Sequence, residues 1–186
     1  MNKISEPEPF RSFLIDKLPE PLTPASSHLQ IIDRYIADTE VRLRRVRDPN
    51  SSALNFLLQK RLAIRSGNAT LCRREDIHLS DVEYSIFDRF VGDEVRKNRY
   101  FHEFDRRMMV FDIYLGELSG LATTRVNFVN AKELEDYVPP PFAVFEITND
   151  PFFDGHNIAG NTFSSVQAEV KRVGQISPSL AELADE

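Results

Sequence analysis

The sequence predicts an α+β fold dominated by antiparallel β-strands. Most of the chain alternates apolar and polar residues with a period of two, which is typical of strands that bury one face. Short connections rich in turn residues separate these segments. Only two segments carry the start signal of a helix. Many strands with few helices favour a barrel or a sandwich.

Eight segments have the strand pattern, and FRSFLIDKL, within residues 1–27, adds a short ninth. The eight are HLQIIDRYI (28–36), EVRLRRVR (40–47), LNFLLQKRLAI (54–64), TLCRREDIHL (70–79), EVRKNRYFHEF (94–104), MMVFDIYL (108–115), LATTRVNFV (121–129) and FAVFEITND (142–150). Connections such as RDPNSS (47–52) and IRSGNA (64–69) predict consecutive antiparallel hairpins.

Two helices are expected between the strands. In SDVEYSIFDRF (80–90), Ser80 and Glu83 have the spacing of a capping box, and three apolar residues share one helix face. NAKELEDYV (130–138) repeats the signal. After about residue 160 the strand pattern ends, and residues 161–186 form a polar tail with a helical pattern.

Composition excludes several classes of protein. With 41% hydrophobic and 28% charged residues, the 186-residue chain is typical of a soluble globular domain. The net charge of -6 argues against nucleic acid as a partner. No apolar run approaches the roughly 18 residues of a membrane span, and the acidic start is unlike a signal peptide, so we expect a cytoplasmic location. A single cysteine, Cys72, excludes an internal disulfide.

Charged residues occupy one face of several predicted strands. Arg42 and Arg44 alternate with Val41 and Leu43, and Asp112 lies between apolar neighbours in the same way. One interpretation is a half-buried sheet with its polar face in water, which the pattern alone favours. The other is a closed barrel with a charged interior and helices over its apolar outside.

The order of motifs over residues 8–159 resembles the CYTH superfamily, the triphosphate tunnel metalloenzymes. Arg42-Leu43-Arg44 is similar to the family's R-x-R strand, and Lys60 is similar to the lysine of the next strand. The later motifs are matched by Lys97 and Arg99 for K-x-R, Asp112 for an aspartate, and Glu146 and Asn157 for the closing segment. The resemblance implies a closed eight-stranded antiparallel β-barrel with helices packed outside, spanning residues 1–160.

The resemblance also implies a site inside the barrel. Basic side chains would bind a triphosphate: Arg42, Arg44, Lys60, Lys97 and Arg99. Arg74 and Arg125, which do not match the family's basic motifs, are added as further candidate inward cations that would bind it. Acidic side chains would hold Mg²⁺ or Mn²⁺: Glu8, Asp76, Asp112 and Glu146. Of these, Glu146 and Asp112 would be the catalytic pair, and Asp33 is a further candidate for an inward carboxylate. A hard divalent ion requires such oxygen ligands, and it would neutralise the phosphoryl group during attack.

The chain departs from the family pattern at two strands. The first strand of the family carries E-x-E-x-K, where this chain has Glu8, Phe10 and Ser12. A later E-x-E is replaced by Arg125 and Asn127. In the strand at 70–79 the inward pair is either Arg74 with Asp76 or Glu75 with an apolar residue, and we favour the first. Arg125 is expected to pair with Glu146 or Asp112.

Two functions therefore remain open. The first is a protein that binds a triphosphate or another polyanionic phosphate without metal and without hydrolysis. The second is an active Mg- or Mn-dependent triphosphatase, and adenylyl cyclase activity is the least supported. A collapsed tunnel kept as a scaffold is a third alternative. The expected partner is a phosphate-rich small molecule, and a homodimer is left open.

Overall fold

The computed structural model describes residues 8–66 and 69–176, with side chains for residues 9–60 and 75–174. Strands make up most of it: β1 (Glu8–Leu14), β2 (His28–Ile36), β3 (Val41–Arg47), β4 (Leu54–Ser66), β5 (Ala69–Leu79), β6 (Gly92–Phe104), β7 (Arg107–Leu115), β8 (Ala122–Asn127) and β9 (Phe145–Glu146). The α-helices are α1 (Asp81–Phe87), α2 (Ala131–Glu135), α3 (Gly155–Ile158) and α4 (Phe163–Ile176). Two 3₁₀ turns, η1 (Gly116–Leu118) and η2 (Pro151–Phe153), complete the set.

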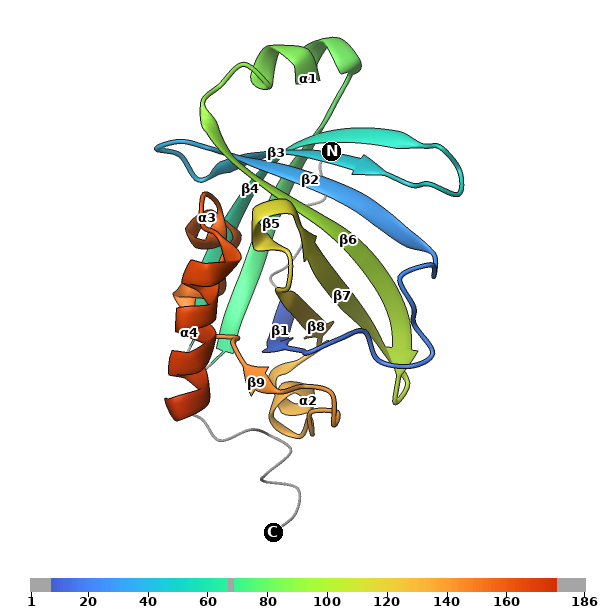
Figure 1. Cartoon of the computed structure of the whole chain (residues 1–186), viewed down its shortest axis with the longest axis vertical. Coiled ribbons are helices and arrows are strands. Elements are labelled where there is room, and N and C mark those ends of the chain that lie inside the picture. Colours follow the sequence, from blue (N-terminus) through green and yellow to red (C-terminus); the bar gives the residue numbers. More distant parts are fainter. Residues whose placement is uncertain (1–7, 67–68, 177–186) are drawn as a thin grey trace.

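The strands form one antiparallel sheet in the order β5-β4-β3-β2-β6-β7-β8-β1-β9. The expected α+β fold with an antiparallel sheet and few helices is confirmed. Figure 1 shows that this sheet is strongly curled. β5, at one end of this order, also pairs with β1, the strand next to the other end, at Glu8–Cys72 and Pro9–Leu71. A barrel closed by hydrogen bonds around its whole circumference therefore stays a prediction.

The strand register decides which side chains share the inner face. Asp33 is paired with Arg44, and Tyr35 with Arg42, across β2 and β3. Directly paired residues on antiparallel strands point to the same side. Across β6 and β7, Arg99 is paired with Asp112, so these two side chains also point to the same side.

Helix α1 begins as its sequence predicts. Ser80 and Glu83 form the capping box, with the Ser80 hydroxyl accepting from the Glu83 N–H. The apolar face of this segment is nevertheless exposed: Val82 is 72% and Ile86 56% accessible. In Figure 1, α1 stands at the upper end of the sheet, away from α2 and β9 at the lower end. This apolar face is therefore not covered by the described part of the chain.

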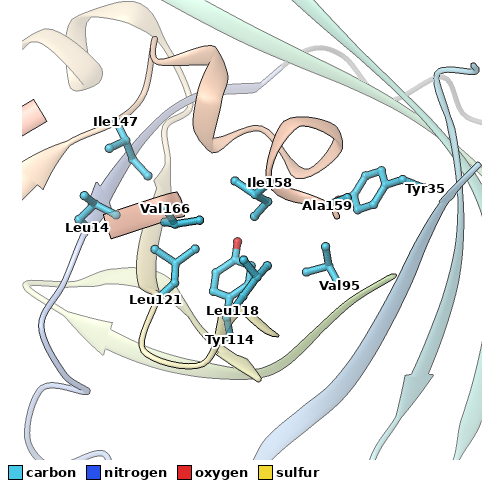
Figure 2. Close-up of a cluster of buried hydrophobic side chains, with 10 residues drawn as sticks. All are labelled: Leu14, Tyr35, Val95, Tyr114, Leu118, Leu121, Ile147, Ile158, Ala159 and Val166. Carbon is cyan, nitrogen blue, oxygen red and sulfur yellow. The ribbon is translucent and has the colours of Figure 1, made fainter. Parts of the chain in front are cut away.

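Two apolar clusters hold the described chain together. The first contains inner-face residues of the strands, such as Tyr35, Val95 and Tyr114, packed against Ile158 and Val166 of α3 and α4 (Figure 2). The second lies on the opposite face of the sheet, around Phe13, Met109 and Phe111. Through this cluster, α3 and α4 pack against the inner face of the sheet.

Helix α4 comes from the segment predicted as a polar tail, and its Val166 is fully buried. Among the described residues, no helix is long and apolar enough to cross a membrane.

Candidate functional site

A cavity of about 470 Å³ lies against the inner face of the curled sheet. Its walls come from β1, β2, β3, β6, β7 and β8, and residues between Ile147 and Ile158 close one side. Five cationic side chains line the described part of this cavity: Arg42, Arg44, Lys97, Arg99 and Arg125. In an acidic protein, this concentration of cations is the main electrostatic feature of the interior.

Asp33 holds the two arginines of β3. Arg44 donates Nε–H and Nη2–H to the two Asp33 oxygens, at 2.6 and 2.7 Å. Arg42 places its Nη1 3.6 Å from Asp33 Oδ2. Burial by itself would raise the pKa of Asp33, but the two guanidinium groups outweigh it and hold that pKa well below its ordinary value. Asp33 is fully buried, so it is a permanent anion beneath the cavity wall.

Asp112 has the same relation to the cations of β6. Arg99 donates Nε–H and Nη2–H to it, each at 2.7 Å, and Lys97 Nζ lies 2.8 Å from Oδ2. Burial would raise the pKa of Asp112, but Lys97 and Arg99 hold it far below its ordinary value. Burial lowers the pKa of Lys97 to about 8, against the opposing effect of Asp112. Each buried carboxylate thus forms ion pairs with two cationic side chains.

Arg125 forms part of the wall made by β1 and β8. Its guanidinium carbon lies 3.7 Å from the centre of the Phe10 ring, in a cation–π contact, and its Nε donates to Asn127 Oδ1 at 2.9 Å. Arg125, Phe10 and Asn127 all line the cavity. The two acids expected to pair with Arg125 form ion pairs with other cations: Asp112 binds Lys97 and Arg99, and Glu146 binds Arg11.

Gln59 occupies the position on β4 that was expected for Lys60. Gln59 is paired with Arg42 and accepts from the Arg42 Nε at 2.9 Å. Its amide donates to Asp76 Oδ1 at 2.9 Å. Lys60 is exposed and is paired with Val41, so it lies on the other face of the strand. The expectation that Lys60 lines the cavity is not met, because the register with β3 places Gln59, and not Lys60, opposite Arg42.

Glu146 also lies outside the cavity. Its carboxylate accepts from Arg11 Nε at 2.9 Å and from the Thr148 hydroxyl at 2.6 Å. It belongs to a second, shallow depression that includes Asp150 and Arg172. The structure therefore does not bring Glu146 together with Asp112, and the expected catalytic pair is not assembled.

Of the remaining predicted residues, Asp76 has a described side chain, and Glu8 and Arg74 have a described backbone only. The backbone register pairs Asp76 with Gln59 and Arg74 with Arg61, which agrees with the register favoured for this strand. Asp76 is exposed at the side of the cavity where it binds Gln59. The side chains of Glu8 and Arg74 lie outside the described part of the chain.

The described side chains do not fit a divalent metal ion. Within residues 9–60 and 75–174, no group of three or more His, Cys, Asp or Glu side chains is placed to hold a metal. Mg²⁺ and Mn²⁺ require several oxygen ligands, and both oxygens of Asp112 already accept from cations. The expected metal site is therefore not supported by this part of the chain.

Solved structures with the same architecture place the chain in a known fold. A crystal structure described as the inorganic triphosphatase NE1496 aligns with a TM-score of 0.57 and 18% identity, over 84% of this chain and 97% of that chain. The chain shares the fold of this structure. A second structure, described as the hypothetical protein NE1496, gives the same score and identity over 83% and 99% of the two chains. The PH1819 protein from Pyrococcus horikoshii OT3 aligns at a TM-score of 0.48 and 15% identity, over 69% and 82%. No family model and no curated protein matches the sequence.

Within this fold, the sequence predicted the positions of the cations better than those of their partners. Five of the predicted basic residues line the cavity: Arg42, Arg44, Lys97, Arg99 and Arg125. Gln59, Tyr35 and Arg11 were missed. Tyr35 accepts from Arg42 Nη1 at 3.3 Å. The signal that could have found Gln59 and Tyr35 is the hairpin register, because both are direct cross-strand neighbours of Arg42.

Proposed function

We propose that this protein binds a triphosphate or another polyanionic phosphate in its basic cavity, without a divalent metal ion and without hydrolysing it. The observation that carries the proposal is the convergence of Arg42, Arg44, Lys97 and Arg99 on one cavity. Guanidinium and ammonium groups in a partly buried cavity bind phosphate through charge-assisted hydrogen bonds. In this proposal β1 and β5 complete a closed barrel, and the cavity is its lumen. The pairings at Glu8–Cys72 and Pro9–Leu71 support such closure.

The absence of hydrolysis is proposed from the surroundings of the two expected catalytic acids. Asp112 is held by Lys97 and Arg99, and Glu146 is held by Arg11 outside the cavity. A metal ion bound to the phosphate would need carboxylate oxygens that the described residues use elsewhere. In this proposal the protein therefore acts as a receptor for its anion.

The alternative is a metal-dependent triphosphatase. It is favoured by the likeness in fold to a structure described as an inorganic triphosphatase. It requires that Asp112 leave Lys97 and Arg99 to coordinate a metal, or that the ligand supply most of the metal's oxygen ligands.

Calorimetric titration with tripolyphosphate tests the proposal. The same titration is run in chelator and in Mg²⁺ or Mn²⁺, with phosphate release measured in parallel. We expect equal binding in both and no release. Metal-dependent heat with release would establish the alternative, and no heat in either condition would refute binding of a triphosphate.

Single substitutions then locate the binding. Arg42→Ala and Arg44→Ala should each weaken tripolyphosphate binding by about tenfold or more, because each removes charge-assisted hydrogen bonds. Arg45→Ala is the matched control, since Arg45 is exposed on the other face of β3. Equal weakening by all three would mean that the ligand responds to the overall charge of the protein and not to the cavity.

A further inference from the structure

Helix α1 carries apolar residues on two sides, and one of these sides packs on the sheet. The centre of the Tyr84 ring lies 4.3 Å from that of Phe56, which points to the outer face of β4. Arg34 of β2 donates Nη1–H to the backbone oxygen of Asp88 at 2.6 Å, and the same nitrogen lies 3.3 Å from the Asp88 carboxylate. These contacts hold α1 in one orientation on the outside of the sheet.

The other side of α1 presents a stripe of apolar side chains to solvent. Val82, Ile86 and Phe90 follow one another at every fourth position, which places them on one side of a helix. Phe90 lies beyond the last helical residue, but the N–H groups of Arg89 and Phe90 still bond to the oxygens of Ile86 and Phe87, so the chain keeps turning. The three side chains of the stripe are 72%, 56% and 51% exposed.

This stripe lies where another macromolecule can reach it. Single exposed apolar residues are common on protein surfaces, but a row of them on one side of a fixed helix is typical of an interaction surface. In Figure 1, α1 stands at the upper end of the molecule. The described part of the chain leaves the stripe uncovered, so a partner that packed on it would remove its apolar area from water.

The charges beside the stripe are arranged symmetrically about its centre. Glu83 lies three residues before Ile86 and Arg89 three residues after it, and both are exposed. When two copies of α1 lie antiparallel with Ile86 at the centre, Glu83 of each copy comes level with Arg89 of the other copy. Val82 likewise comes level with Phe90. A two-fold axis requires a surface that is complementary to itself, and this surface meets that requirement in charge as well as in apolar character.

We propose that α1 is the contact surface of a homodimer, in which two copies of the chain pack their Val82, Ile86 and Phe90 side chains together, antiparallel, about a two-fold axis at Ile86. Burial of the stripe provides the affinity, and the opposite charges of Glu83 and Arg89 favour the antiparallel direction. The proposal goes beyond phosphate binding and does not depend on it, because no residue of α1 lines the cavity.

Sedimentation velocity of the full chain, at protein concentrations from about 1 to 100 µM, tests the proposal. We expect a reversible dimer. Ile86→Asp should raise its dissociation constant by at least tenfold, because two carboxylates would meet at the centre of an apolar contact. Val138→Asp is the matched control, since Val138 is 82% exposed in the segment between α2 and β9, and it should leave the dimer unchanged.

Two results of this experiment would overturn the proposal. The first is a dimer that persists unchanged in Ile86→Asp, because the interface would then lie elsewhere. The second is a monomer at every concentration. If Ile86→Asp then also lowered the urea midpoint of that monomer, the stripe would be covered by a segment of the same chain.

Arg89→Glu tests the direction of the pairing. It places like charges at the same level in the antiparallel dimer, so the dissociation constant should rise by on the order of tenfold at low salt and by less at high salt. Lys171→Glu is the control, because it changes the net charge equally at an exposed position on α4. Equal weakening by both variants would overturn the antiparallel arrangement, since net charge alone would then govern association.

Discussion

Replacing Asp33 by Asn should destabilise the protein more than most single substitutions. Asp33 is fully buried and accepts two hydrogen bonds from Arg44 at 2.6 and 2.7 Å. Asparagine has nearly the same shape, but it loses the charge and turns an N–H₂ group toward a guanidinium donor. Removing one partner of a buried ion pair costs about 3–5 kcal/mol, because the other charge remains buried. For a chain of this length, that corresponds to a fall in Tm of about 10 °C.

Urea unfolding of a mutant cycle provides the assay. Asp33→Asn, Arg44→Met and the double variant are compared with the unaltered protein, with equal m-values as the condition for comparing midpoints. The double variant should be less destabilised than the two single variants added together, since it leaves fewer unpaired charges. A loss below about 1 kcal/mol for Asp33→Asn, or simple additivity, would refute the assignment of Asp33 as the anchor of this group.

The same residue predicts how stability depends on acid. The pKa of Asp33 is lower in the folded protein than its ordinary value of 3.8. Its contribution is therefore fully present above that value and is lost as the pH falls toward the folded pKa. Asp33→Asn should flatten the loss of stability below about pH 4. If the free energy of unfolding falls below about pH 4 in the variant as steeply as in the unaltered protein, other carboxylates govern acid unfolding.

Three further predictions concern single positions. Because the pKa of Lys97 is about 8 in the folded protein against an ordinary value of 10.5, phosphate affinity should fall above pH 8, and the free energy of unfolding should rise between pH 8 and 10.5. Both trends should disappear in Lys97→Met, as measured by calorimetry and urea unfolding across that range. Gly155→Ala should cost about 1–3 kcal/mol in urea unfolding, because the new Cβ would overlap the Tyr35 hydroxyl; a neutral effect would show that α3 moves freely. Lys60→Ala should leave tripolyphosphate binding unchanged while Arg42→Ala weakens it, and a loss of binding with Lys60→Ala would contradict the observed strand register.

The alternation of β3 was enough to predict where its arginines point. Arg42 and Arg44 are separated by Leu43, which is almost fully buried on the other face of the strand, so the two faces differ clearly. On β4 the adjacent Leu57 and Leu58 are both half-buried, and alternation alone does not say which face is inward. The register with β3 settles it in favour of Gln59, and that register is a property of two strands together.

Glu146 was misplaced for a different reason. The segment 142–150 has the composition of a strand, but β9 contains only Phe145 and Glu146. A period-of-two argument needs a longer extended segment than this. The direction of Glu146 is fixed instead by Arg11 on β1, a contact between distant parts of the sequence. The sequence places three apolar residues on one face of α1, but whether such a face is buried depends on a partner element that local sequence does not specify.

The strand order has a consequence for how the chain folds. β1 is the first of the described strands to leave the ribosome, yet it pairs with β8 and β9, near the other end of the described chain. β3 and β6, which carry Arg42, Arg44, Lys97 and Arg99, are joined through β2, and β2 is far from β6 in sequence. Contacts of such large sequence separation are formed late, since the entropy of closing long loops is lost before they stabilise anything. The anion site therefore forms only after nearly the whole sheet has formed. During synthesis, β1 leaves its apolar face exposed until β8 and β9 have been made.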